Sequence, residues 1–113
     1  MTAADYLDTL AARKDLIARV DRLTAPFDAV VMPTVPIVAP AIAKLVADDT
    51  AYARANLLVL RNTTVGNFLD RCALTVPCHE SGTAPVGFSL MAEHGADRRL
   101  PAMGLAVEAA LVR

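Results

Sequence analysis

Apolar residues recur at helical spacing near the start of the chain. The helical face that they share is formed by Tyr6, Leu10, Ile17 and Val20. Thr2, followed three residues later by Asp5, is typical of a helix N-terminus, because the hydroxyl accepts a free backbone N–H and the carboxylate suits the positive end of the helix dipole. The pattern predicts a first helix that ends before Pro26, since proline cannot continue a helix.

Three short apolar runs, at residues 28–32, 73–76 and 86–91, predict strands. The first run is almost continuously apolar and β-branched, which indicates a strand buried on both faces. Pro33 and Pro77 follow the first two runs and are expected to end these strands, because proline has no N–H to donate. The loop between the second and third runs is short enough for an antiparallel hairpin, although each strand could instead pair with a strand outside this chain.

A second helix is predicted to begin at Asp48, Asp49 or Thr50 and to break at Gly66. Its second half and its end carry many polar groups for so apolar a neighbourhood. They are Asn56, Arg61, Asn62, Thr63, Thr64 and Asn67. Buried polar groups need hydrogen-bond partners, so this cluster predicts either ties to a neighbouring loop or the wall of a wet cavity.

A last helix is predicted at the C-terminal end. Asp97 is a suitable N-cap, but Pro101 would then lose a helical hydrogen bond, so the helix either starts later, near Leu100, or is kinked. Gly104 permits close packing of this helix against a sheet. Gly87, inside the third predicted strand, indicates a bulge or the close approach of another backbone.

Composition limits the classes of protein to which the chain can belong. Its 113 residues make one domain at most. Hydrophobic residues form 55% of it and aromatic residues only 4%, whereas roughly 45–50% apolar is usual for globular proteins. Such an aliphatic excess is expected of a segment from the interior of a larger protein, or of a chain that associates with copies of itself.

Charge and apolar runs argue against two kinds of partner. The net charge is -1 and the basic residues are scattered, which disfavours a nucleic-acid-binding protein. The most apolar stretch, residues 29–43, is interrupted by three prolines and falls short of the roughly 18 apolar residues of a membrane helix. Met1 is not followed by the pattern of a signal peptide, and Cys72 and Cys78 do not resemble a disulfide framework, so a cytoplasmic protein is expected.

Four short motifs follow one another along the chain. They are Pro33-Thr34, Thr63-x-x-x-Asn67, Ala73-Leu74-Thr75-Val76-Pro77-Cys78 and Pro85-Val86-Gly87-Phe88. Together they resemble the C-terminal part of amidase-signature hydrolases, and the likeness extends from about Tyr6 to Leu111. The resemblance implies an α/β fold, a mixed sheet with helices on both faces, of which only the C-terminal part is present. It also implies that these elements complete the sheet and one side of the substrate funnel of an enzyme that hydrolyses an amide C–N bond.

The catalytic triad of that family is a serine, a bridging cis-serine and a lysine, which come from a Gly/Ser-rich core earlier in the protein. This chain has two serines, Ser81 and Ser89, and two lysines, Lys14 and Lys44. Neither serine lies in a Gly/Ser-rich run or a Gly-x-Ser-x-Gly elbow, and a serine nucleophile needs a base within hydrogen-bond reach. Residues 1–113 are therefore expected to be one incomplete domain, a fragment that is inactive alone, with no catalytic residue, metal or cofactor.

The resemblance also supplies candidates for a wall of the substrate pocket in the whole enzyme. They are Pro33, Thr34, Arg61, Asn67, Cys78 and His79. The proline-rich segment 33–40 suits either such a wall or a rigid surface connector, and structural hydrogen bonds are the competing interpretation for Arg61 and Asn67. The expected partners are the missing N-terminal amidase portion or a second copy of the chain, with a small-molecule amide as substrate of the full enzyme.

Three other functions are alternatives. The first is a non-enzymatic small α/β interaction or oligomerisation protein. The second is a cysteine-dependent hydrolase built on Cys78 and His79, although neighbouring side chains of an extended strand point to opposite faces. The third is an anion site at Arg98 and Arg99, which follow a predicted helix cap. A zinc site is disfavoured because its candidate ligands lack Cys-x2-Cys and His-x3-His spacing. These ligands are Cys72, Cys78, His79 and His94.

Overall fold

The computed structural model describes residues 1–111, which form helices on both sides of a small sheet. In chain order the elements are α1 (Ala3–Thr24), β1 (Val30–Pro33), α2 (Ile42–Ala47), α3 (Asp49–Phe68), β2 (Cys72–Pro77), β3 (Gly87–Ala92), the 3-10 helix η1 (Ala96–Arg98) and α4 (Leu100–Leu111). The strand order is β1-β3-β2, and β3 pairs antiparallel with both neighbours. The predicted hairpin of the second and third strands is confirmed.

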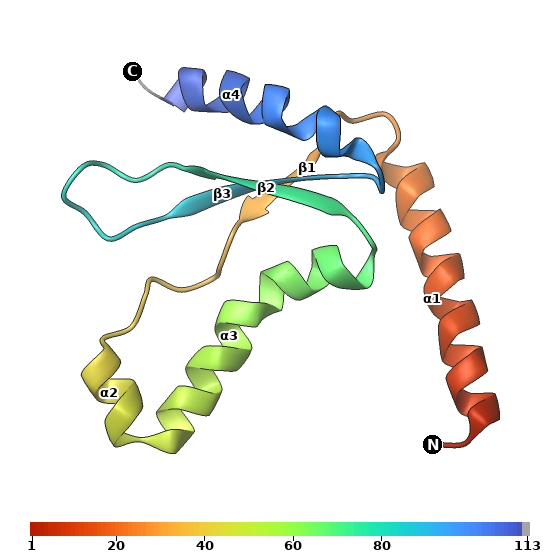
Figure 1. The fold of residues 1–113 in the computed structure, drawn as a ribbon, viewed down its shortest axis with the longest axis horizontal. Helices are drawn as coiled ribbons and strands as arrows, with labels where there is room; N and C mark the ends of the chain where they lie inside the picture. The colour runs from red at the N-terminus through yellow and green to blue at the C-terminus, as the bar shows by residue number, and fades with distance from the viewer. Residues whose placement is uncertain (112–113) are drawn as a thin grey trace.

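Helices lie on both faces of this sheet (Figure 1). α4 packs over β2 and β3 on one face, and α3 lies against the other face, where Gly66 faces Met91. A Cβ at Gly66 would lie 3.0 Å from the Met91 sulfur, so the glycine lets the helix approach the sheet closely. The α/β class with helices on both faces is confirmed, and the three strands described here are all antiparallel to their neighbours.

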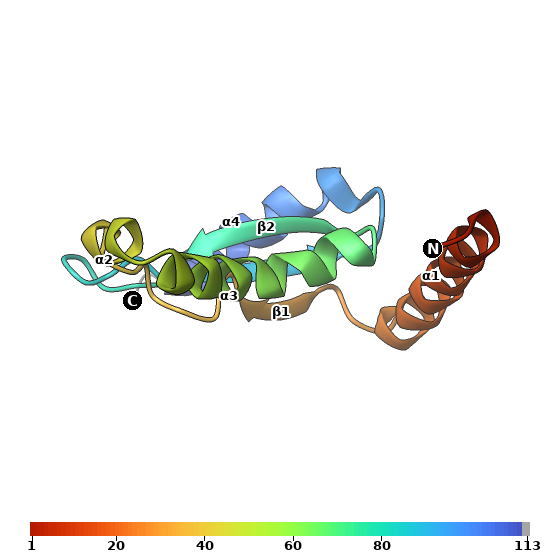
Figure 2. The ribbon, with the colours of Figure 1, turned by 90° about the horizontal axis from the view of Figure 1, so that it is seen from below.

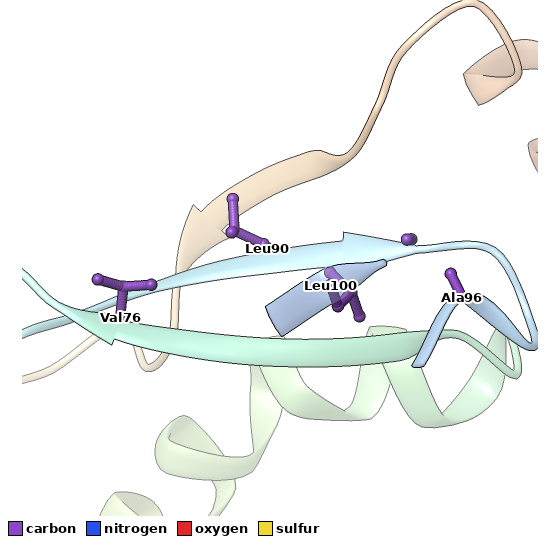
Figure 3. Packing of buried hydrophobic residues seen from close by; sticks show 5 residues of the cluster. Val76, Leu90, Ala96 and Leu100 are labelled. Carbon is purple, nitrogen blue, oxygen red and sulfur yellow. The ribbon is translucent and has the colours of Figure 1, made fainter. Parts of the chain in front are cut away.

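The hydrophobic core lies between α4 and the β2–β3 hairpin (Figure 3). Each core residue is at most 7% exposed; they are Val76, Leu90, Ala92, Ala96 and Leu100. Alternation along the strands directs the members from β2 and β3 to the same face. Gly104 allows α4 to approach β2, because a Cβ at this position would collide with the Leu74 side chain. The predicted close packing at Gly104 is therefore confirmed.

The first strand and the two prolines differ from expectation. Residues of β1 alternate between half-buried and exposed, and Val31 is 53% exposed, so β1 is not covered on both faces. Pro33 and Pro77 lie within their strands and do not end the pairing. The next residues, Thr34 and Cys78, donate their N–H groups across the sheet to backbone carbonyls at 2.8 and 3.0 Å. Since alternate residues bond to the same neighbour, each proline nitrogen points away from β3, where no donor is needed.

Capping side chains set the starts of the two long helices. α1 begins with a capping box of Thr2 and Asp5, as predicted, and α3 begins after Asp48, whose carboxylate accepts two N–H groups of the first turn. α3 then continues through Gly66 to Phe68, so the predicted break at Gly66 is wrong. The glycine is tolerated because its position faces the sheet and needs a small residue. The short helix α2 was not expected from the apolar pattern.

α4 begins at Leu100, the later of the two predicted starts. Pro101 consequently lies in the first turn, where a helix does not use the backbone N–H that proline lacks. Asp97 lies inside the preceding 3-10 helix η1, whose N-cap is Gly95, so it is not the N-cap of α4. Among the helices of residues 1–111, none combines the length and the apolar character that crossing a membrane requires.

α1 stands beside the rest of the molecule, and none of its 22 residues is buried (Figure 2). Along the predicted apolar face, Ile17 and Val20 are half-buried, whereas Tyr6 and Leu10 are exposed. Side-chain hydrogen bonds, and not a shared hydrophobic core, therefore hold this helix in place.

Arg13 makes one of these attachments. Its Nε donates to the Phe68 carbonyl at 2.8 Å and its Nη2 donates to the Asn67 carbonyl at 3.4 Å, both at the C-terminal end of α3. The guanidinium also lies 5.8 Å from the centre of the Phe68 ring. A cation at a helix C-terminus satisfies free carbonyls and interacts favourably with the helix dipole.

Candidate functional site

Three hydroxyl groups meet on the sheet face that α3 covers. Thr34 directly follows β1, Thr75 lies in β2 and Ser89 lies in β3. The hydroxyl oxygens are separated by 2.9 Å between Thr34 and Ser89, 3.1 Å between Thr75 and Ser89, and 3.2 Å between Thr34 and Thr75. We call these residues the hydroxyl cluster. Because each hydroxyl has two partners, the buried Ser89 is satisfied without water.

The strand register brings the hydroxyl cluster together. Thr75 lies opposite Ser89, and the Thr34 N–H donates to the Gly87 carbonyl at 2.8 Å. Residues opposite one another on antiparallel strands share a face, so the three side chains point the same way. A Cβ at Gly87 would lie 2.6 Å from both the Thr34 hydroxyl oxygen and the Thr75 methyl carbon. The close approach predicted at Gly87 is therefore real, but side chains make it instead of a passing backbone.

A cavity of about 220 Å³ lies between the hydroxyl cluster and α3. Asn62 and Asn67 of α3 line it, together with the cluster. Asn62 donates through Nδ2 to the Pro33 carbonyl at 2.8 Å and accepts from Arg61 Nε at 3.3 Å. Asn62 thus ties α3 to the end of β1, which confirms a structural hydrogen bond for this residue, and Asn67 lines the cavity.

The predicted pocket residues fall into two groups. Thr34 and Asn67 line the cavity, and Pro33 and Arg61 are connected to it by the hydrogen bonds of Asn62. The other two, Cys78 and His79, lie on the loop after β2 and outside the cavity lining. Substrate contact by any of the six stays a prediction.

Cys78 and His79 approach the same backbone oxygen. The chain bends at His79, so the two side chains do not occupy successive positions of an extended strand. Cys78 Sγ lies 3.6 Å and His79 Nδ1 lies 3.4 Å from the Val86 carbonyl oxygen, and both residues are exposed. Across residues 1–111, no group of three or more His, Cys, Asp or Glu side chains is placed to hold a metal ion.

Among residues 1–111, neither serine is hydrogen-bonded to a lysine or histidine side chain. The side chain of Ser89 bonds to the two threonine hydroxyls, and Ser81 lies in the exposed loop between β2 and β3. Lys14 and Lys44 belong to α1 and α2, outside the cavity lining. A serine nucleophile requires a base within hydrogen-bond reach. The hydroxyl cluster can therefore orient or bind a polar group, but the described contacts do not prepare Ser89 for nucleophilic attack.

Arg71, between α3 and β2, is a buried residue that the sequence pattern did not reveal. Its side chain is 4% exposed, and its Nη2 donates to Asp21 at 2.8 Å and to the Thr24 hydroxyl at 2.6 Å, both on α1. Its Nε is buried and has no hydrogen-bond partner in residues 1–111. The guanidinium borders both the 220 Å³ cavity and a cavity of about 420 Å³ beside α1. Asp70, just before it, adopts φ 55°, which turns the chain from α3 into β2.

Some of the site residues that were not predicted could have been found from the sequence, and others could not. Thr75 and Ser89 are polar residues on the neighbouring strands β2 and β3. A predicted antiparallel register for these strands would have placed the two residues opposite each other. Asn62 was noted among the polar residues of the second helix, without its partner Pro33. For Arg71 the sequence holds no signal, because an arginine between a helix and a strand is ordinarily exposed.

Comparison with known proteins identifies relatives across nearly the whole chain. The family model described as Amidase matches residues 1–100. The 2-amino-5-chloromuconic acid deaminase of Comamonas testosteroni is 34% identical over 110 residues, which cover 96% of this chain and 24% of the relative. A glutamyl-tRNA(Gln) amidotransferase subunit of Sulfurisphaera tokodaii is 28% identical over 106 residues, 94% of this chain and 22% of the relative. The corresponding protein of Sulfolobus acidocaldarius is 27% identical over 95 residues, 84% and 19% of the two chains.

No solved structure gives a significant match. The chain spans about a quarter of the length of the curated relatives that it matches. The family model, by contrast, covers nearly all of the chain, including the hydroxyl cluster and all six predicted pocket residues. The chain therefore belongs to the Amidase family.

Proposed function

We propose that this chain is the C-terminal part of a cytoplasmic amidase that hydrolyses the C–N bond of a small-molecule amide. In the whole enzyme the chain completes the sheet and one wall of the substrate funnel. The serine, cis-serine and lysine of the triad then belong to an N-terminal amidase portion, which is the partner of this chain. Family membership and the coverage of about a quarter of each curated relative support this division.

The hydrogen bonding of Ser89 carries the proposal. Its hydroxyl is engaged by Thr34 and Thr75 at 2.9 and 3.1 Å, which leaves it in a network of neutral hydroxyls with no base. An acyl-transfer enzyme needs both an activated nucleophile and donors for the oxyanion. The chain then contributes one wall of the site and its hydrogen bonds, and the N-terminal amidase portion contributes the catalytic residues.

The test joins the chain to the portion that it is proposed to need. In the Comamonas testosteroni deaminase, the 110 residues that match are exchanged for this chain, and ammonia release from 2-amino-5-chloromuconic acid is measured. This substrate is an amine and not an amide, so the assay tests whether the chain completes a family active site, and the amide substrate is sought separately. We expect turnover by the chimera and none by the chain alone. The relative without any C-terminal region is the matched control and should be inactive. Amide hydrolysis by the isolated chain that is lost on Ser89→Ala would contradict the proposal.

The predicted pocket residues are tested in the same chimera. Arg61→Ala and His79→Ala are expected to raise KM and to leave the unfolding midpoint nearly unchanged, because both side chains are exposed. Lys14→Ala, also on an exposed position but away from the cavity, is the matched control. Equal KM values for all three variants would remove these two residues from the pocket.

An interaction protein is the second candidate function. It is favoured by the large apolar side chains that the chain exposes, among them Leu7 and Leu23 of α1 and Leu57 of α3, each more than 60% exposed. Exposed apolar surface of this extent marks sites of association. An inactive chimera, combined with one defined mass and cooperative unfolding of the chain alone, would favour this candidate over the amidase part.

A further inference from the structure

The hydroxyl cluster presents hydrogen-bond acceptors, and not donors, to the cavity of about 220 Å³. A hydroxyl has one proton to donate and two lone pairs that accept. The Thr34 hydroxyl donates to Thr75, so its bond with Ser89 is donated by Ser89, and Thr75 in turn donates to Ser89. The three hydrogen bonds therefore use all three protons, and each oxygen keeps one free lone pair.

The helix wall of the same cavity supplies donors from side-chain amides. The Thr63 hydroxyl is not among them, because it donates to the Leu60 carbonyl at 3.1 Å. Asn62 gives one of its two Nδ2 hydrogens to the Pro33 carbonyl and keeps the other. Within residues 1–111 the side chain of Asn67 makes no hydrogen bond, and only its backbone carbonyl accepts one. Acceptors thus line the sheet side, and free amide N–H groups lie on α3.

The charges around the cavity favour a neutral ligand. No carboxylate lines this cavity within residues 1–111, so an ammonium group would lose its water without gaining a counter-charge. A carboxylate would face hydroxyl oxygens that have no proton left to donate. The one charged residue of the lining, Arg71, is already paired with Asp21 at 2.8 Å. A neutral group that carries both N–H donors and a carbonyl acceptor suits both walls.

We propose that this cavity binds a primary carboxamide, R–CO–NH2. Its NH2 group donates to the free lone pairs of the hydroxyl cluster, and its carbonyl oxygen accepts from the side-chain N–H of Asn67 on α3. The space is sufficient, because a single water molecule needs only about 10–15 Å³ of the roughly 220 Å³ present. The inference rests on the proposed amidase function and narrows its substrate to amides with an unsubstituted nitrogen.

Titration of the isotope-labelled chain with propionamide tests the proposal through the backbone NMR signals of Thr75 and Ser89. Propionate and N,N-dimethylpropionamide are the matched probes, because both keep the propionyl group and lack the N–H donors. Propionamide is expected to shift the two signals in a saturable way, and the other two probes are expected to leave them in place. Equal responses to the three probes, or no response to propionamide, would overturn the proposal.

Substitution of Thr75, which is exposed, tests the count of protons in the cluster. Thr75→Val removes one acceptor and should raise the Kd of propionamide roughly three- to tenfold, whereas Thr75→Ser should restore the affinity. The two hydroxyls that remain in Thr75→Val share one hydrogen bond, so one proton becomes free and propionate should bind better than it does to the unmodified chain. Thr9→Val, on α1 and outside the lining, is the matched control. Unchanged affinities of Thr75→Val for both probes would contradict the proposed site.

The deaminase chimera separates this inference from the proposed function. An active chimera, combined with a chain that does not distinguish propionamide from propionate, would overturn the carboxamide site and leave the amidase role intact. Selective binding of propionamide by the chain, combined with an inactive chimera, would support the site and count against the amidase role.

Discussion

Gly87 and Thr34 are in contact through both backbone and side chain. The Thr34 N–H donates to the Gly87 carbonyl at 2.8 Å, and a Cβ on Gly87 would lie 2.6 Å from the Thr34 hydroxyl oxygen. The absence of a side chain at Gly87 is therefore what allows β1 and β3 to pair while the hydroxyl cluster forms beside them.

Gly87→Ala is expected to lower the free energy of unfolding by about 1–3 kcal/mol, because the added methyl overpacks the contact with Thr34 and Thr75. Urea unfolding followed by circular dichroism gives the value. The matched control is the same change in a Thr34→Ala, Thr75→Ala background, where the colliding atoms are gone and the cost should shrink. An equal cost in both backgrounds would mean that the close contact is not the cause.

The hydroxyl cluster predicts a non-additive pair of substitutions. Thr34→Val or Thr75→Val alone should each cost about 1 kcal/mol or less, because Ser89 keeps one hydroxyl partner. The double variant leaves the buried Ser89 hydroxyl without a side-chain partner and should cost roughly 1–3 kcal/mol more than the sum. Unfolding free energies of the four proteins complete the cycle, and strict additivity would argue against a shared network.

Asp21→Ala is expected to destabilise the protein more than Arg71→Met. Removing Asp21 leaves the 4% exposed guanidinium without its counter-charge, whereas Arg71→Met leaves an aspartate that is 42% exposed and can be hydrated. The cost of Asp21→Ala should be about 2 kcal/mol, below the value for a fully buried pair because of this exposure. Denaturant unfolding measures both, and Asp15→Ala, on the same helix, is the control. The reverse order of the two effects would contradict the buried-charge explanation.

Asp5 makes the start of α1 sensitive to acid. The Thr2 backbone and side-chain hydrogen bonds lower the pKa of Asp5 below its ordinary 3.8. A group with a lowered folded pKa stabilises the fold above its unfolded pKa, and this contribution is lost as the pH falls through the folded pKa. Side-chain NMR titration should thus give Asp5 a pKa below 3.8, and Thr2→Ala should return it toward that value. A pKa of 3.8 or higher in the unmodified chain would show that the capping box does not form.

Local signals in the sequence were enough to predict much of the secondary structure. Thr2 with Asp5, and the acid at Asp48, mark helix starts because capping depends only on neighbouring backbone groups. Pro101 narrowed the last helix to a later start or a kink, and the start at Leu100 is the one found. Gly66 was misleading, because its small size serves packing against Met91 on a strand far along the chain. Tertiary contact overrides a local helix-breaking preference in this case.

The candidate site was less accessible from sequence, because its parts come from distant segments. Thr34 was identified by its motif, but the partners that complete the hydroxyl cluster lie 41 and 55 residues further along the chain. The burial of Arg71 depends on α1 lying beside the sheet, an arrangement that the apolar pattern of the helix does not specify. The strand register and the placement of the helices thus determine which residues meet in the site. Neither can be predicted from a short stretch of residues.

One face of β3 is polar and the other is apolar, and this difference affects which strand register forms during folding. Ser89 points into the hydroxyl cluster, whereas its neighbour Leu90 points into the apolar core. A slip of one residue would exchange them, stranding a hydroxyl among aliphatic side chains and a leucine among hydroxyls. Both errors raise the energy of the misaligned sheet, so the hydroxyl cluster disfavours the wrong strand register while the hairpin folds.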